Sequence, residues 1–114
     1  FVPRAMVDDV VRALGKRLAA TKVGDPSVEG VRMGPLAGRS QVTEVGKALE
    51  ALRAGAEVAW GGGDVEVVGA SRDAGAFFPI TLLHNDRPFD RTAPHDVEAF
   101  GPVNTVMPYD SVDE

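Results

Sequence analysis

The sequence predicts an α/β fold with a mainly parallel sheet and flanking helices. Two stretches, residues 4–20 and 40–54, carry apolar side chains at helical spacing. Two others, residues 76–83 and 103–109, are apolar runs of strand length, which is typical of strands buried on both faces of a sheet. The 114 residues suffice for one compact domain and are too few for two.

The first helix is predicted over residues 4–20. Its buried stripe is expected to comprise Val7, Val10, Val11, Leu14 and Leu18. Acidic residues near its start and basic residues near its end suit the helix dipole. A turn is expected at residues 23–26, because Gly24 and the step into Pro26 both disfavour a helix.

The second helix is predicted over residues 40–54. We expect Ser40 to cap its start and Gly55 to follow its end as the C′ residue. Its buried face is expected to comprise Val42, Val45, Leu49 and Leu52.

Three consecutive glycines, residues 61–63, follow a short predicted strand at residues 57–60. Glycines let backbone N–H groups approach a phosphate closely, but the Gly-x-Gly-x-x-Gly spacing and a following Lys-Ser/Thr pair are absent here. A turn between strands is therefore predicted. Residues 65–68 form either a brief strand or part of a variable loop that extends to Ala74.

Residues 76–83 predict a buried strand, in which Pro79 indicates an edge position or a bulge because Pro lacks an N–H. A polar surface loop is expected over residues 85–94. Residues 103–109 predict an interior strand of the sheet, with its further strands outside this chain. At residues 111–114 the sequence predicts the N-cap and acidic first turn of a helix, so we expect both ends to be cut from a longer protein.

Glu98 and Phe100 form the candidate ligand site. Two positions apart on an extended backbone, they are expected to face the same side and to contact one ligand together. We expect Gly101 to adopt a backbone conformation closed to other residues and Pro102 to stiffen the exit into the strand at Val103. Such a loop at the end of a strand lies where ligands bind in open α/β sheets.

Composition excludes several classes of function. The formal charge of −5 and dispersed basic residues do not suit nucleic acid or an anionic membrane surface. Without cysteine the chain has no disulfide and no Cys-based metal site. No apolar run approaches a membrane span and no secretory leader is evident, so a cytoplasmic protein is expected.

Other catalytic arrangements have weaker support. His84 and His95 are eleven residues apart, which matches no metal-ligand spacing, so no metal site is predicted. Ser40 and Ser71 lie outside a Gly-x-Ser-x-Gly elbow, which argues against a serine triad. Helix-start electrostatics explains the paired carboxylates at residues 8–9 and 113–114 better than catalysis does.

Residues 98–103, Glu-Ala-Phe-Gly-Pro-Val, resemble the signature loop of the NAD(P)-dependent aldehyde dehydrogenases. The further matching pieces, in the family's order, are Phe1-Val2-Pro3-Arg4, Val23-Gly24-Asp25-Pro26, Gly34-Pro35-Leu36, Gln41, Gly55-Ala56, Gly61-Gly62, Gly75-Ala76-Phe77-Phe78 and Thr81-Leu82-Leu83. The resemblance implies that residues 1–114 are a partial catalytic domain, downstream of the nucleophilic Cys and truncated at both ends.

The resemblance also implies a function. The parent enzyme would oxidise an aldehyde to the acid with NAD or NADP as hydride acceptor, while no catalytic residue lies in this chain. By resemblance, Glu98 binds the nicotinamide-side ribose, Phe100 packs near the nicotinamide and Gln41 reaches toward the adenosine side. Glu44 stands where many relatives carry Lys, and a solvated Gln on a helix is an equally good interpretation of Gln41.

Within the family, the Gly-Ala-Phe-Phe-Pro, Glu-Ala-Phe-Gly-Pro-Val and Met-Pro phrases are similar to the dehydrogenase domains of the bifunctional ring-opening enzymes of phenylacetate degradation. That similarity implies a CoA-linked semialdehyde as substrate. The alternative is a non-catalytic α/β interaction module with the family's shape. We expect the exposed sheet edge to pair with another copy, as a homo-oligomer, or with the missing part of the parent.

Overall fold

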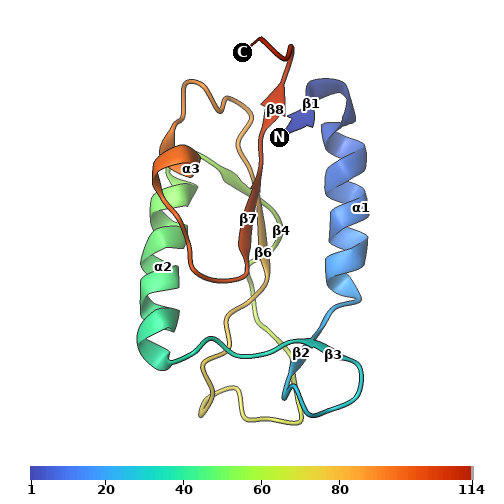
Figure 1. Ribbon diagram of the computed structural model, residues 1–114, viewed down its shortest axis with the longest axis vertical. Coiled ribbons are helices and arrows are strands. Elements are labelled where there is room, and N and C mark those ends of the chain that lie inside the picture. The colour runs from blue at the N-terminus through green and yellow to red at the C-terminus, as the bar shows by residue number, and fades with distance from the viewer. Residues whose placement is uncertain (114) are drawn as a thin grey trace.

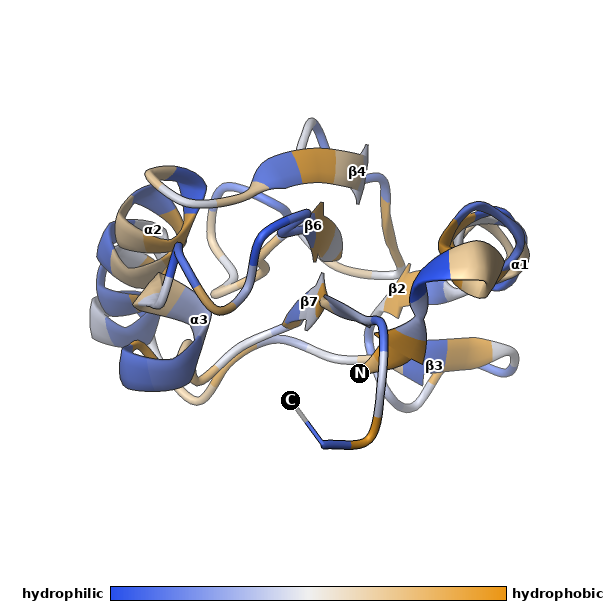
Figure 2. Ribbon diagram, turned by 90° about the horizontal axis from the view of Figure 1, so that it is seen from above, coloured by the Kyte–Doolittle hydropathy of each residue, from blue (hydrophilic) through white to orange (hydrophobic). Residues whose placement is uncertain are grey.

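A central sheet lies between two long helices in the computed structural model, which describes residues 1–113 (Figure 1). The helices are α1 (Val7–Ala19) and α2 (Arg39–Arg53). The sheet has the order β4-β6-β7, formed by β4 (Glu57–Gly61), β6 (Thr81–His84) and β7 (Val103–Val106). Seen from above, α1 and α2 cover opposite faces of this sheet (Figure 2). The predicted α/β architecture is confirmed.

Two adjacent leucines in β6 divide the apolar interior into two clusters. Leu82, 3% exposed, packs with Val7 and Val106 on the α1 face, together with Leu14 and Trp60. Leu83, fully buried, packs on the α2 face, where its buried neighbours are Leu49, Leu52 and Ala56. Because side chains alternate along a strand, one strand supplies both cores.

Two smaller sheets lie beyond the ends of the central one. β3 (Val31–Met33), β2 (Lys22–Gly24) and β5 (Val67–Val68) form a parallel sheet in that order. At the other end, β1 (Val2–Pro3) pairs in parallel with β8 (Pro108–Tyr109). Within residues 1–113 every strand pair is parallel except β4 with β6, which confirms the prediction of a mainly parallel arrangement.

Both predicted helices form, with changes at their starts. A 3₁₀ turn, η1 (Arg4–Met6), precedes α1. The expected cap by Ser40 is wrong, because α2 begins one residue earlier and its N-cap is Gly38, which makes no side-chain capping bond. Gly55 follows the C-cap residue Ala54, as expected for C′. None of the helices within residues 1–113 is long and apolar enough to cross a membrane.

The glycine triplet connects β4 to the segment that leads to β5, as predicted for a turn between strands. Gly61 and Gly62 have φ values of 75° and 76°, and the Gly62 N–H donates to the Ile80 carbonyl at 3.1 Å. No helix follows the triplet before β6. Of the alternatives for residues 65–68, the structure forms a brief strand over the last two.

The strand expected over residues 76–83 is shorter and later, because β6 begins at Thr81. Pro79 lacks the N–H that a ladder needs, and the Ala76 carbonyl accepts a bond from the Leu36 N–H at 2.8 Å rather than from a neighbouring strand. Residues 76–80 therefore run as an irregular segment into β6.

The loop at residues 85–94 is only partly a surface loop, because Asn85 is fully buried. Its side-chain amide donates to the Arg91 carbonyl at 2.7 Å, and its Oδ1 accepts from the Arg87 N–H at 3.0 Å. The loop leads into a short helix, α3 (Ala93–Asp96). A polar side chain thus holds this loop in shape from within, which a polar composition alone does not predict.

The strand expected over residues 103–109 is divided at Met107 into β7 and β8. The Met107 carbonyl accepts from the Val2 N–H at 2.9 Å, where the chain changes partner from β6 to β1. In the described part of the chain β7 is an edge strand, paired only with β6. Ser111 Oγ accepts from the Asp113 N–H at 3.3 Å, as an N-cap would, while Glu114 lies outside the described residues.

An ion pair joins the two ends of the described chain. Arg4 donates to both carboxylate oxygens of Asp110, from Nε at 2.7 Å and from Nη2 at 2.8 Å. These bonds lower the pKa of Asp110 below its ordinary value. The two ends of the described chain consequently lie at the same end of the molecule (Figure 1).

Candidate functional site

Residues 97–100 alternate between core and solvent, and the segment starts in an extended conformation at Val97. Val97 and Ala99 pack against the cluster that contains Leu49 and Leu83. Glu98 is exposed, and Phe100 is 73% exposed although it is a large apolar side chain. The period of two therefore places the acid and the ring on the same outward side, as predicted.

Helix α2 forms the opposite wall of a groove beside this segment. The groove encloses about 510 Å³, and its lining residues are Gln41, Glu44, Val45, Lys47, Ala48, Glu98 and Phe100. Gln41 lies three and four residues before Glu44 and Val45, and Ala48 lies four and three residues after them, so one face of the helix presents the four side chains together. The structure thus brings all three predicted site residues, Gln41, Glu98 and Phe100, into one open groove.

Gly101 ends the segment, and its role differs from the one expected. Its φ is not positive, so the backbone there needs no special conformation. Instead a Cβ at this position would lie 2.8 Å and 2.9 Å from the two γ carbons of Val45. Gly is required by the close approach of the loop to α2.

The groove lies at the amino ends of the parallel strands β6 and β7, which corrects the expected location. Residues 97–102 precede β7, and the Thr81 N–H at the start of β6 donates to the Pro102 carbonyl at 2.9 Å. The general rule places ligands at the carboxyl ends of strands. Here the segment that follows α3 runs alongside α2 and reaches β7 at its amino end (Figure 1).

The polar groups of the groove suit a ligand rich in hydroxyl groups. Glu44 and Lys47 form an exposed ion pair at 2.9 Å, which leaves Glu98 as the carboxylate at the loop side of the groove. Gln41 Oε1 accepts from the Ala37 N–H at 2.9 Å, so its NH₂ group is the part suited to donate to a ligand. An ionised carboxylate accepts several hydrogen bonds and donates none, as binding of a diol requires.

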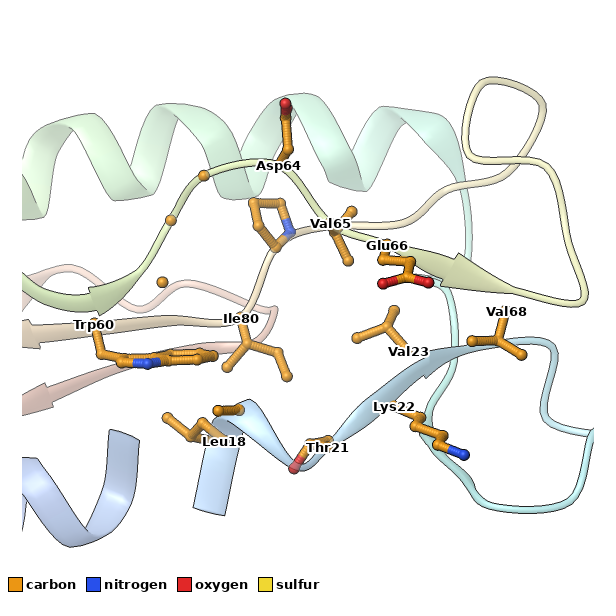
Figure 3. Close-up of a pocket in the computed structure, with 15 residues that line it drawn as sticks. Leu18, Thr21, Lys22, Val23, Trp60, Asp64, Val65, Glu66, Val68 and Ile80 are labelled. Carbon is orange, nitrogen blue, oxygen red and sulfur yellow. The ribbon is translucent and has the colours of Figure 1, made fainter. Parts of the chain in front are cut away.

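A second cavity, of about 410 Å³, was not predicted from the sequence. It lies between the end of α1, β2 and the glycine triplet, with Leu18 and Trp60 at one end and Lys22 and Val68 at the other (Figure 3). Its walls are mainly apolar, and Asp64 and Glu66 lie on its rim. No local pattern indicates this cavity, because it joins segments that are far apart in sequence.

The two histidines occupy separate places. The His95 ring stacks on Phe1 with centroids 6.0 Å apart, and its Nε2 lies 3.0 Å from the Pro88 carbonyl oxygen. His84 is in β6. Within residues 1–113 no three His, Asp or Glu side chains gather as a metal ion would require.

A parallel sheet flanked by helices, with an acid–aromatic loop facing one helix, defines an α/β protein with a groove suited to a hydroxyl-rich, flat ligand. The chain belongs to the aldehyde dehydrogenase family, whose model matches residues 1–114. It is 43% identical over 109 residues to 3,4-dehydroadipyl-CoA semialdehyde dehydrogenase of Aromatoleum evansii, covering 95% of this chain and 20% of that protein. It is 35% identical over 115 residues to betaine aldehyde dehydrogenase of Brucella anthropi, covering 100% of this chain and 23% of that one.

Solved structures agree with this assignment. An aldehyde dehydrogenase from Mycobacterium tuberculosis complexed with NAD⁺ superposes with a TM-score of 0.79 and 32% identity, over 98% of this chain and 22% of that one. Succinic semialdehyde dehydrogenase from Streptococcus pyogenes, in complex with NADP⁺, gives a TM-score of 0.79 and 25% identity, over 96% and 23%. The resemblance seen in the sequence is confirmed, and the chain spans about a fifth of the length of these relatives.

Proposed function

We propose that the groove between α2 and residues 97–100 binds the nicotinamide half of NAD or NADP in an enzyme that oxidises an aldehyde to the acid. The observation that carries this proposal is the joint exposure of Glu98 and Phe100 in one groove with Gln41. An exposed aromatic ring beside an exposed carboxylate matches a ligand with a flat ring joined to a diol. Family membership and the cofactors of the two solved relatives support the same assignment.

Each of the three residues has a distinct role in this proposal. The Glu98 carboxylate accepts hydrogen bonds from the two hydroxyls of the nicotinamide-side ribose. Phe100 packs near the nicotinamide and limits its movement, while Gln41 reaches toward the adenosine side. Bound NAD(P) would supply the hydride acceptor. These residues hold and orient it, so their contribution is to positioning.

The bond-making groups of the reaction lie outside these residues. The chain contains no cysteine, so a thiolate nucleophile comes from elsewhere in the parent protein, as does the general base, and the 114 residues alone are inactive. For the substrate we propose a semialdehyde linked to coenzyme A. The name of the Aromatoleum relative, which states such a substrate for that protein, supports this choice.

Replacing Glu98 by Gln in the full-length enzyme tests the cofactor role. Hydrogen bonds to a charged group contribute about 1.5–3 kcal/mol, so we expect the single-turnover rate of NAD(P)H formation to fall by about 10- to 100-fold. Stopped-flow absorbance at saturating aldehyde measures that rate. Glu50→Gln is the matched control, because Glu50 is exposed on α2, pairs with Arg53 and does not line the groove.

The outcomes separate the enzyme from the interaction module. A Glu98→Gln variant that forms NAD(P)H as fast as the unchanged enzyme would contradict the cofactor role. A full-length protein without measurable NAD(P) binding would favour the interaction module. An equal loss of rate in Glu50→Gln would assign the effect to net charge rather than to the groove.

We also propose that the free edge of β7 pairs with another copy of the chain or with the rest of the parent. Within residues 1–113 the four-residue strand β7 has one partner, and each backbone hydrogen bond left unmade along its free edge forfeits about 1 kcal/mol. The isolated 114-residue chain is therefore expected to self-associate. Light scattering at micromolar concentration measures its mass, and a monodisperse monomer would contradict the pairing.

A further inference from the structure

We propose that the contact between Gly101 and Val45 sets the width of the groove, which makes both of them positioning residues for Glu98 and Phe100. This inference rests on the proposed function, since it concerns the same groove. Val45 lines the groove with Ala48 and is only 2% exposed, so it is both part of the wall and part of the interior. Gly101 follows directly after Phe100 and is the residue through which the loop meets that wall.

The contact leaves no space for a side chain on the loop. A Cβ at position 101 would meet the Val45 Cγ1 at 2.8 Å, its Cγ2 at 2.9 Å and its Cβ at 3.4 Å. Separations below about 3.0 Å require one of the two partners to move. A buried Val in a helix strongly prefers one χ1 rotamer, so rotation of its side chain away from the new methyl group is unfavourable. We therefore expect the loop to move.

The loop is held on both sides of Gly101, so its position follows from this contact. The Gly101 N–H donates to the Ala99 carbonyl at 2.7 Å, and the Val103 N–H donates to the Gly101 carbonyl at 2.7 Å. The Pro102 carbonyl accepts a hydrogen bond from the Thr81 N–H at the start of β6. These tight turns make residues 99–103 a rigid unit, and a displacement at Gly101 is passed to Phe100 and Glu98 rather than absorbed locally.

The test uses the full-length enzyme and its affinity for NADH and NADPH. Gly101→Ala is expected to raise the Kd by about tenfold, because the displaced loop would lose about one hydrogen bond between the Glu98 carboxylate and the cofactor, and a hydrogen bond to a charged group is worth about that factor in affinity. Adding Val45→Ala removes both γ carbons that the new methyl group meets, so the double variant is expected to bind within about twofold of the unchanged enzyme. Fluorescence titration measures each Kd.

Matched controls separate positioning from loss of fold. Gly46→Ala places a methyl group on the same helix where nothing lies within 4 Å, so its Kd is expected not to change. Thermal melting shows whether each variant is folded. If Gly101 had only a structural role, Gly101→Ala would lower the melting temperature, and adding Val45→Ala would not restore the Kd. Recovery of the Kd by the second substitution is the specific signature of this contact.

The result that overturns the inference differs from the one that overturns the proposed function. If Glu98→Gln binds NADH and NADPH normally, the cofactor role itself fails. If Glu98→Gln weakens binding but a folded Gly101→Ala does not, or the double variant does not recover, only the positioning role fails. Should Gly101→Ala not fold, Val45→Ile enlarges the same contact from the helix side. It is expected to weaken binding, and normal binding by folded Val45→Ile would equally overturn the inference.

Discussion

A Gly61→Ala substitution is expected to lower the free energy of unfolding by about 3 kcal/mol or more, the sum of a left-handed backbone penalty and a disrupted strand ladder. Gly61 has a φ of 75°, and an added Cβ would lie 2.0 Å from the Ile80 carbonyl oxygen. That oxygen belongs to the backbone next to Thr81, the residue opposite Gly61 in the pairing of β4 with β6. The clash cannot be relieved by a side-chain rotation, so the two strands must separate locally.

The neighbouring glycines provide graded controls. Gly62 has a φ of 76° but only ordinary contacts of 3.5 Å, so Gly62→Ala is expected to cost about 1–2 kcal/mol from backbone strain alone. A Cβ added at Gly63 would meet no atom within 4 Å, and its φ is not positive, so Gly63→Ala is expected to change stability by less than about 0.5 kcal/mol. Urea unfolding of the three variants measures the series, and equal losses would refute this account of the turn.

Leu83→Ala is expected to cost about 2–5 kcal/mol, through lost apolar burial and the cavity left behind. Leu83 is fully buried at the centre of the α2-side cluster, where Leu49, Leu52 and Ala56 surround it. Strands and helix on this face are already fixed by their own hydrogen bonds, so they can close only part of the vacated space. The loss in free energy of unfolding should therefore be close to that of a large truncation in a core, and well above that of a surface truncation.

Urea unfolding again measures the effect, with Val112→Ala as its control. Val112 is 88% exposed, so its truncation is expected to change stability by less than about 0.5 kcal/mol. A Leu83→Ala variant as stable as the Val112→Ala variant would show that the α2-side cluster is not a packed core. Val97 and Ala99 pack on the same cluster, so its loosening is also expected to reach the loop that carries Glu98.

Local periodicity made much of the fold predictable. The apolar faces of both helices follow from a repeat of three to four residues. Of the side chains expected to be buried, Val7, Val45, Leu49 and Leu52 are buried. The others are half-buried: Val10, Val11, Leu14, Leu18 and Val42. The outward placement of Glu98 and Phe100 follows from a repeat of two along residues 97–100. The motif around them identified the family, which the match over residues 1–114 confirms. These features depend on residues within about one turn of each other.

Other features depend on residues that are distant in sequence. Asn85 is polar yet fully buried: its side chain hydrogen-bonds the loop that follows it, and its N–H donates to the carbonyl of the distant Val106 at 3.0 Å. The predicted start of β6 is too early. From the sequence, Pro79 is compatible with an edge position or a bulge inside a strand, and only the structure shows which residues 76–80 contact. The cavity beside Trp60 is also not predictable from any single segment, because its lining residues come from several segments of the chain.

The sequence by itself determined the family, the two helices, the mainly parallel strands and the pairing of an acid with a ring on one side of a loop. Only the tertiary structure decided that this loop lies at the amino ends of β6 and β7, that α2 supplies the other wall of the groove and that Gly101 is needed for its contact with Val45. The physical reason is the distance along the sequence over which each effect acts. The spacing of side chains determines which way neighbouring residues point, whereas the approach of Val45 and Gly101, which are 56 positions apart, is determined by the packing of whole helices and strands.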